Sequence, residues 1–189
     1  GDVASVAGIA KGTLYNHFAD RSALLGATER GTADNPVRVA FVGYAAAHKG
    51  WPAFVEVAAA IEDLAAYQAF HFTAVPANPA LPNVSTIPTK VLPGARGAMT
   101  AALIAHSIDL VLVLSAWPET FCLVAYEAVA SGAAVITLLG SGNVADMVLA
   151  SGRGLVMPDT ESIIDFFIGG APLVYVRMWG GPGPAMGRV

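Results

Sequence analysis

The strongest constraint on the fold is a regular alternation of short apolar runs and longer amphipathic segments between residues 37 and 168. The runs are rich in Val, Ile, Leu and Phe, as in parallel strands that are covered on both faces. The segments between them carry apolar residues at helical spacing. Strands that alternate with helices form βαβ units, so we predict an α/β fold with a Rossmann-like, doubly wound and mostly parallel sheet. The predicted strands are 37–43, 67–75, 108–115, 133–139 and 154–157, and the predicted helices lie within 51–66, 98–106, 119–131, 143–150 and 161–168.

Composition limits the kinds of protein that this chain can be. Its 189 residues are 55% hydrophobic and only 13% charged, which is typical of a densely packed protein and not of a disordered one. The net charge of −4 argues against a large nucleic-acid-binding surface. The single cysteine, Cys122, excludes an internal disulfide and fits a reducing cytoplasm, which is the expected location. The most apolar run, 128–139, is interrupted by Ser131 and Gly132 and is shorter than the roughly 20 residues that a bilayer requires.

Changes in composition divide the chain into three parts. The turn-rich segment GTADNP (31–36) separates a helical attachment, predicted for 1–32, from the α/β domain, predicted for 36–170. The final part, 171–189, ends in MWGGPGPAMGRV and is predicted to be a loose Gly/Pro-rich tail. Within the α/β domain, a loop with several prolines is predicted for 76–94.

Two glutamates stand out in the apolar stretch SAWPETFCLVAYEAVASG (115–132). We expect Glu119 in the first turn of a helix, just beyond the carboxyl end of a parallel strand, where doubly wound sheets bind their ligands. Backbone N–H groups and the positive end of the helix dipole favour an anionic or hydroxyl-rich ligand there. Glu127 follows two turns later, about 12 Å along the axis and about 80° around it, so both carboxylates are predicted to border one cleft. The alternative is that Glu119 is an ordinary acid at a helix start and Glu127 a solvated residue.

The same stretch resembles a family signature. PETFCLVAYEAVASGAAVI resembles the E-x7-E signature of retaining, nucleotide-sugar-dependent glycosyltransferases with the GT-B fold. VRVAFVGYAAAHKGWPAF resembles the strand, glycine loop and Lys-Gly turn that open the donor-binding domain of that family, and SGNVADMV with GRGLVMPD resembles the segments after the signature. The resemblance extends over about residues 36–168 and includes features of a branch found in bacterial surface-polysaccharide synthesis. It implies the C-terminal half of a GT-B enzyme, whose acceptor-binding domain would be missing from this chain.

The resemblance also implies roles for individual residues. Glu119 would contact hydroxyls of the donor sugar, and Glu127 would accept hydrogen bonds from the ribose of the nucleotide. Lys49 would face the diphosphate, which suits an ammonium group acting as a point charge. Tyr44 and Cys122 depart from the family, because many relatives have Arg and Gly at these two positions. The other implied donor-binding groups are Gly43, the backbone amides of Phe121, Cys122 and Leu123, and the loop residues Gly140, Ser141, Gly142 and Asn143.

The N-terminal segment resembles a different family. DVASVAGIAKGTLYNHFADRSALL is similar to the helix-turn-helix of TetR-type transcriptional regulators, with its turn at Gly8. The preceding helix and the dimerising domain of that family are missing, and dimers are what set half-site spacing on DNA. We interpret the segment as a truncated motif joined to an unrelated domain, with a chance amphipathic hairpin as the alternative. A DNA-binding regulator is the competing function, and its implied DNA contacts are Lys11, Thr13, Tyr15, Asn16 and His17.

No metal site and no cofactor is predicted. The four histidines have no ligand spacing, and His71, between Phe70 and Phe72, is expected to be an ordinary sheet residue. Cys122 has no neighbouring base that would make it a nucleophile. The leading hypothesis is a domain that binds a nucleotide-diphosphate sugar for transfer to a glycan or lipid-linked acceptor, with no turnover expected of the chain by itself.

Overall fold

The computed structural model describes residues 30–89 and 97–179. The segment that resembles a helix-turn-helix lies outside these residues, and so do its implied DNA contacts, Lys11, Thr13, Tyr15, Asn16 and His17.

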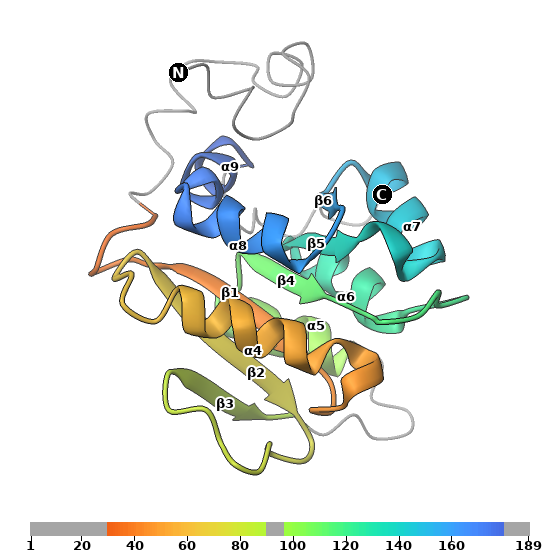
Figure 1. The fold of residues 1–189 in the computed structure, drawn as a ribbon, viewed down its shortest axis with the longest axis horizontal. Helices are drawn as coiled ribbons and strands as arrows, with labels where there is room; N and C mark the ends of the chain where they lie inside the picture. Colours follow the sequence, from red (N-terminus) through yellow and green to blue (C-terminus); the bar gives the residue numbers. More distant parts are fainter. Residues whose placement is uncertain (1–29, 90–96, 180–189) are drawn as a thin grey trace.

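Six strands in the described residues form one sheet in the order β3-β2-β1-β4-β5-β6 (Figure 1). Every neighbouring pair is parallel. This confirms the predicted α/β class and the Rossmann-like, doubly wound topology. The strands are β1 (Val37–Val42), β2 (Tyr67–Thr73), β3 (Val84–Pro88), β4 (Leu110–Val113), β5 (Ala134–Leu138) and β6 (Gly154–Met157).

Helices cover both faces of the sheet, and each face has its own core (Figure 1). Val39 and Phe41 of β1 belong to one core, while Ala40 and Val42 belong to the other, as the two-residue period of a strand requires. Both faces are buried, which explains why the strands are almost continuously apolar in sequence. Helices α4 (Trp51–Ala60), α8 (Thr160–Ile168) and α9 (Ala171–Trp179) cover the first face, and α5 (Ala98–Ala105), α6 (Leu123–Ser131) and α7 (Asn143–Ser151) cover the second.

Helix α9 corrects the predicted tail over its first part, 171–179, and the rest of the predicted tail, 180–189, lies outside the described residues. Pro172 stands in its first turn, where a missing N–H group costs no helical hydrogen bond. Tyr175 and Val176 are buried in the core beside α8. The glycines and prolines that follow drew the prediction toward a loose tail, although the apolar spacing just before them is helical.

Strand β3 corrects the predicted loop over 76–94. It is an edge strand that pairs only with β2 among the described strands, and Pro88 is tolerated there because an edge strand leaves one side of its ladder unpaired. The predicted helix over 51–66 also ends early, at Ala60.

The segment just before β1 is attached to the domain through a buried acid. The carboxylate of Asp109 accepts a hydrogen bond from the Arg38 N–H group at 2.9 Å and forms an ion pair with Arg30 Nε at 3.4 Å. The Asp109 side chain is 0% exposed. Arg30 also donates to Asn35 Oδ1 at 2.8 Å, and its carbonyl accepts from Arg177 of α9 at 3.1 Å. Residues 30–36 are therefore part of the folded unit.

The sheet reverses its winding between β1 and β4. The chain leaves β1 toward α4 on one face, and it leaves β4 toward α6 on the other. The two loops therefore diverge at this point, which is where open α/β sheets bind their ligands.

Candidate functional site at the carboxyl edge of the sheet

Three loops at the carboxyl edge of the sheet are joined by backbone hydrogen bonds. The loop after β1 contains the short helix η1 (Ala47–Lys49), and the carbonyl of His48 accepts from the Ala116 N–H group, in the loop after β4, at 3.1 Å. The loop after β5 contains η2 (Leu139–Ser141), where the Ser141 carbonyl accepts from the Glu119 N–H group at 3.1 Å. The Asn143 N–H group donates in turn to the Glu119 carbonyl at 3.0 Å. Both backbone groups of Glu119, its N–H and its carbonyl, are therefore hydrogen-bonded to residues 141–143.

A glycine makes this close approach feasible. Gly142 forms a single parallel bridge with Glu119 and has a φ of 67°, in the left-handed region. A Cβ atom at this position would lie 2.9 Å from the Cα atom of Pro118 and 3.0 Å from the nitrogen of Glu119. A side chain at residue 142 would therefore push the two loops apart.

The Glu119 carboxylate is the centre of a polar cluster. Its Oε1 atom lies 2.9 Å from Lys49 Nζ and also accepts a hydrogen bond from the Ser115 hydroxyl, and the Cys122 thiol is a further hydrogen-bond partner of the carboxylate. The Glu119 side chain is 8% exposed, whereas that of Lys49 is 41% exposed. Burial raises the pKa of the Glu119 carboxyl, but the hydrogen bonds from Ser115 and Lys49 and the charge of Lys49 outweigh it, so the pKa lies below its ordinary value.

The position of Glu119 differs from the prediction. Helix α6 begins at Leu123 with Cys122 as its N-cap residue, so Glu119 lies in the preceding loop and not in the first helical turn. Its backbone groups pair with the loop after β5 and are not available to the helix. The helical separation predicted between Glu119 and Glu127 therefore does not apply.

Glu127 lies on α6 and lines a separate pocket. This pocket has a volume of about 280 Å³ and also includes Gly43, Tyr44 and Leu123. Its other walls come from the ends of β2 and β3 and from Met99 of α5. Burial raises the pKa of the Glu127 carboxyl.

The remaining predicted residues take different positions. The Ser141 side chain is completely buried, where its hydroxyl donates to the Leu138 carbonyl at 2.7 Å and accepts from Thr137 at 2.8 Å. Phe121, Cys122 and Asn143 line a second pocket, of about 540 Å³, between α6 and α7. The structure therefore brings Lys49 to Glu119, and Gly43 and Leu123 to Glu127, while Ser141, Gly142 and Asn143 hold the main chain of Glu119 through the 141–143 loop.

Two features of the site were not predicted. Ser115, which bonds to Glu119, carries no sequence signal beyond its place at the end of a strand. Trp117 is 52% exposed and stacks on His48 with ring centroids 4.8 Å apart. A tryptophan directly before Pro118, in a loop that follows a strand, is a sequence signal for this site, but its stacking partner His48 is distant in sequence.

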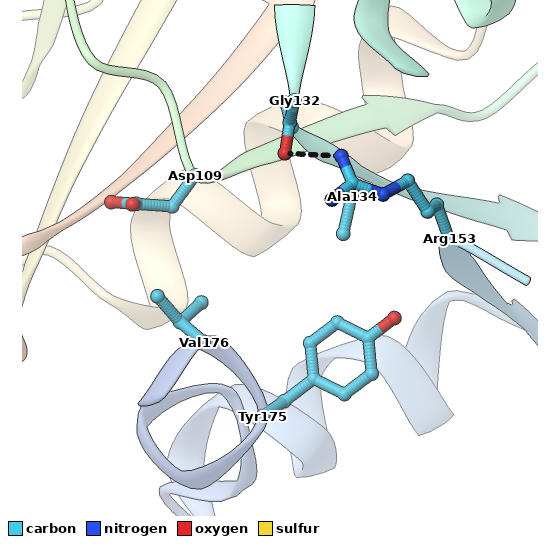
Figure 2. Close-up of a pocket in the computed structure, with 7 residues that line it drawn as sticks. Asp109, Gly132, Ala134, Arg153, Tyr175 and Val176 are labelled. Atoms are coloured by element: carbon cyan, nitrogen blue, oxygen red, sulfur yellow. Dashed lines mark hydrogen bonds between the residues drawn. The ribbon is translucent and has the colours of Figure 1, made fainter. Parts of the chain in front are cut away.

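A further cavity, at the amino ends of the strands, is too small for a ligand larger than a water molecule. Its volume is about 10 Å³, which corresponds to about one water molecule. Asp109, Arg153, Tyr175 and Val176 line it, and the Asp109 carboxylate points away from the other three side chains (Figure 2). Arg153 Nη1 donates to the Gly132 carbonyl at 3.3 Å.

Two other classes of feature are absent from the described part of the chain. Across residues 30–89 and 97–179, no group of three or more His, Cys, Asp or Glu side chains could hold a metal ion. Within the same ranges, no helix has both the length and the apolar character needed to cross a membrane.

The lowered pKa of Glu119 predicts a loss of stability in acid. The unfolded chain takes up this proton first, near pH 4.5, so the contribution of Glu119 is fully present above that pH and is lost as the pH falls through the folded-state pKa. Lys49→Met removes one cause of the shift and should reduce this part of the pH dependence. The free energy of unfolding of both proteins, measured with urea between pH 3 and 6, tests this. If that free energy changes with pH equally steeply in both proteins, Lys49 does not stabilise the carboxylate.

The comparisons with known proteins support the fold. No protein-family model and no curated protein matches the chain. The crystal structure of WaaG, a glycosyltransferase involved in lipopolysaccharide biosynthesis, aligns with a TM-score of 0.56 and 19% identity over 91% of this chain and 48% of WaaG. The C-terminal domain of LpcC, a glycosyl transferase group 1 family protein from Francisella tularensis, aligns with a TM-score of 0.53 and 15% identity over 87% of this chain and 90% of that domain. The chain therefore has the Rossmann-like fold of these glycosyltransferase domains and spans about half the length of WaaG.

Proposed function

We propose that this domain, from about residue 36 to the end of α9, is the donor-binding half of a retaining, nucleotide-sugar-dependent glycosyltransferase of the GT-B type. WaaG acts in lipopolysaccharide biosynthesis, and we infer a glycan or lipid-linked acceptor of the same general kind for this chain. The acceptor would be held by a second domain.

The observation that carries the proposal is the Lys49–Glu119 ion pair. It joins the loops after β1 and β4, where the sheet reverses its winding. An ammonium group and a carboxylate at this edge suit a ligand that combines phosphates with sugar hydroxyls. The E-x7-E spacing and the Lys-Gly turn of the sequence give the same interpretation.

Lys49 would bind the diphosphate without leaving Glu119. Its ammonium group has three N–H donors, of which Glu119 takes one in this structure. The side chain is 41% exposed, so the other donors can reach a ligand. The amides of Phe121, Cys122 and Leu123 stand at the start of the nine-residue helix α6, where N–H groups lack helical partners and the dipole favours an anion.

The two glutamates would bind the sugar parts of the donor. Glu119 is ionised at neutral pH because its pKa is lowered, so its carboxylate can accept hydrogen bonds from sugar hydroxyls. Glu127 would accept from the ribose in the pocket that it shares with Gly43. In the transfer, the bond between the anomeric carbon and the phosphate oxygen breaks, the glycosyl group forms a bond to an acceptor hydroxyl oxygen, and the proton of that hydroxyl is released with the nucleoside diphosphate. The charge that develops on the leaving diphosphate would be stabilised by Lys49 and the helix amides.

A binding panel tests this function. Thermal unfolding is measured with UDP, GDP, dTDP and their sugars, and a nucleotide at about 100 times its Kd should add about 2.7 kcal/mol of stability. Glu127→Ala should weaken binding by about 10-fold to 100-fold, because a hydrogen bond to a charged group is lost. Glu56→Ala, which removes an exposed acid from α4, is the matched control and should bind as the unaltered protein does. If none of the nucleotides stabilises the protein, the proposed function is wrong and only the fold remains.

A further inference from the structure

His71 is a buried imidazole on the face of the sheet that α4 covers, and it directly precedes Phe72, which lines the pocket that contains Glu127. It lies on β2, is 1% exposed, and its Nε2 atom is 2.7 Å from the carbonyl oxygen of Gly43. A carbonyl only accepts, so Nε2 carries the hydrogen and donates it. Burial lowers the pKa of His71, and the bond to Gly43 offsets this only in part, so the ring is neutral near pH 7.

The ring of His71 is fixed by its neighbours. The centroid of Trp51 lies 4.6 Å away and that of Phe41 lies 5.7 Å away. These contacts come from α4 and β1 and restrict the rotation of the imidazole. The direction of the Nε2–H bond is thus set by the core.

Both backbone groups of Gly43 are hydrogen-bonded to residues of β2. Its N–H group donates to the Phe72 carbonyl at 2.9 Å, and its carbonyl accepts from His71. Its φ of 120° is a conformation that side chains rarely adopt. Gly43 and the exposed Tyr44 then form one wall of the pocket that also contains Glu127.

We propose that His71 is a positioning residue for donor binding: by holding the carbonyl of Gly43, it fixes the wall of the pocket in which Glu127 binds the nucleoside. The inference rests on the proposed function and deepens it. His71 itself does not line this pocket and acts through Gly43. Without the bond the glycine turn would sample other conformations, and the ligand would have to order it on binding.

Three variants separate positioning from stability. His71→Gln keeps an N–H donor near the place of Nε2, and His71→Asn keeps an amide that is too short to reach Gly43. Val57→Ala, in the same core on α4, loses packing without touching the Gly43 turn. The measurements are hydrogen exchange of the Gly43 and Tyr44 amides without nucleotide, and the Kd of whichever nucleoside diphosphate stabilises the unaltered protein.

Exchange at Gly43 and Tyr44 should accelerate at least tenfold in His71→Asn relative to Val57→Ala, and the Kd should rise about tenfold, as the loss of one ordinary hydrogen bond implies. His71→Gln should restore both to within about threefold. Equal exchange in His71→Asn and Val57→Ala would overturn the positioning role. A faster exchange with an unchanged Kd would overturn its link to the ligand. If the unaltered protein binds no nucleotide, the proposed function is wrong, and so is the part of the inference that concerns the nucleoside. The hydrogen-exchange data still decide whether His71 holds the turn at Gly43.

Discussion

Replacing Gly50 with alanine is expected to cost about 3 kcal/mol or more of folding stability. Gly50 has a φ of 82°, in the left-handed region, and a Cβ atom there would overlap the carbonyl oxygen of Leu114, the residue directly after β4. Because that overlap is with backbone, no side-chain rotation can relieve it. The loop that carries Lys49 would move away from the loop that carries Glu119, so the ion pair should be lost as well.

Gly97 provides a matched control for this substitution. It has the same φ of 82° at the start of α5, but a Cβ atom there would meet no heavy atom of the described residues within 4 Å. Gly97→Ala should therefore show only the backbone penalty, about 1 kcal/mol. Thermal unfolding should place Gly50→Ala about 10 °C below the unaltered protein and Gly97→Ala a few degrees below it. Equal losses in the two variants would show that the contact with Leu114 does not matter.

Removing the carboxylate of Asp109 is the second large expected effect. Asp109→Ala should cost about 3 kcal/mol, because it leaves the guanidinium of Arg30 and the N–H group of Arg38 without this partner in a buried place. Residues 30–36 should then loosen first, since they are attached through Arg30. Urea unfolding gives the free energy, and hydrogen exchange shows where the structure opens.

Asp109→Asn separates the hydrogen bond from the charge. Burial raises the pKa of Asp109, although the Arg38 hydrogen bond and the charges of Arg30 and Arg38 oppose this. The neutral amide keeps an acceptor for the Arg38 N–H group and avoids burying a charge, so it should cost only about 1 kcal/mol. Asp63→Ala, at an exposed position, should change stability by less than about 0.5 kcal/mol. If Asp109→Asn is as damaging as Asp109→Ala, the ion pair and not the hydrogen bond holds this segment.

Glu119 illustrates what remained unpredictable from local sequence. Its place beyond β4 follows from the apolar run before it, but its conformation depends on Ser141 and Asn143 in another loop. Helical spacing therefore gave a wrong geometry for the Glu119–Glu127 pair. Ser141 shows the same limit, because its hydroxyl satisfies a buried network with Thr137 and Leu138.

Helix α9 and strand β3 show how Gly and Pro residues can mislead a prediction from local sequence. Gly and Pro near the C-terminus predicted a tail, yet α9 buries Tyr175 and Val176 against the sheet. Burial of large side chains outweighs a weak local preference, because each is worth roughly 1.5–3 kcal/mol. Pro88 likewise argued against a strand at β3, but an edge strand tolerates a proline because one side of its hydrogen-bonding ladder is unpaired.

The sequence by itself determined the α/β class, the course of five of the six described strands and the fact that Lys49, Glu119 and Glu127 belong to loops or helices that follow strands. These properties depend on periodicities of two and 3.6 residues, which are local. The tertiary structure alone decided which groups meet. Lys49 and Glu119 are 70 residues apart in the chain, and they form an ion pair because β1 and β4 become neighbours and Gly50 lets the two loops approach. Such contacts depend on the order of strands in the sheet and on the close packing of loops at its edge, and no local pattern encodes either.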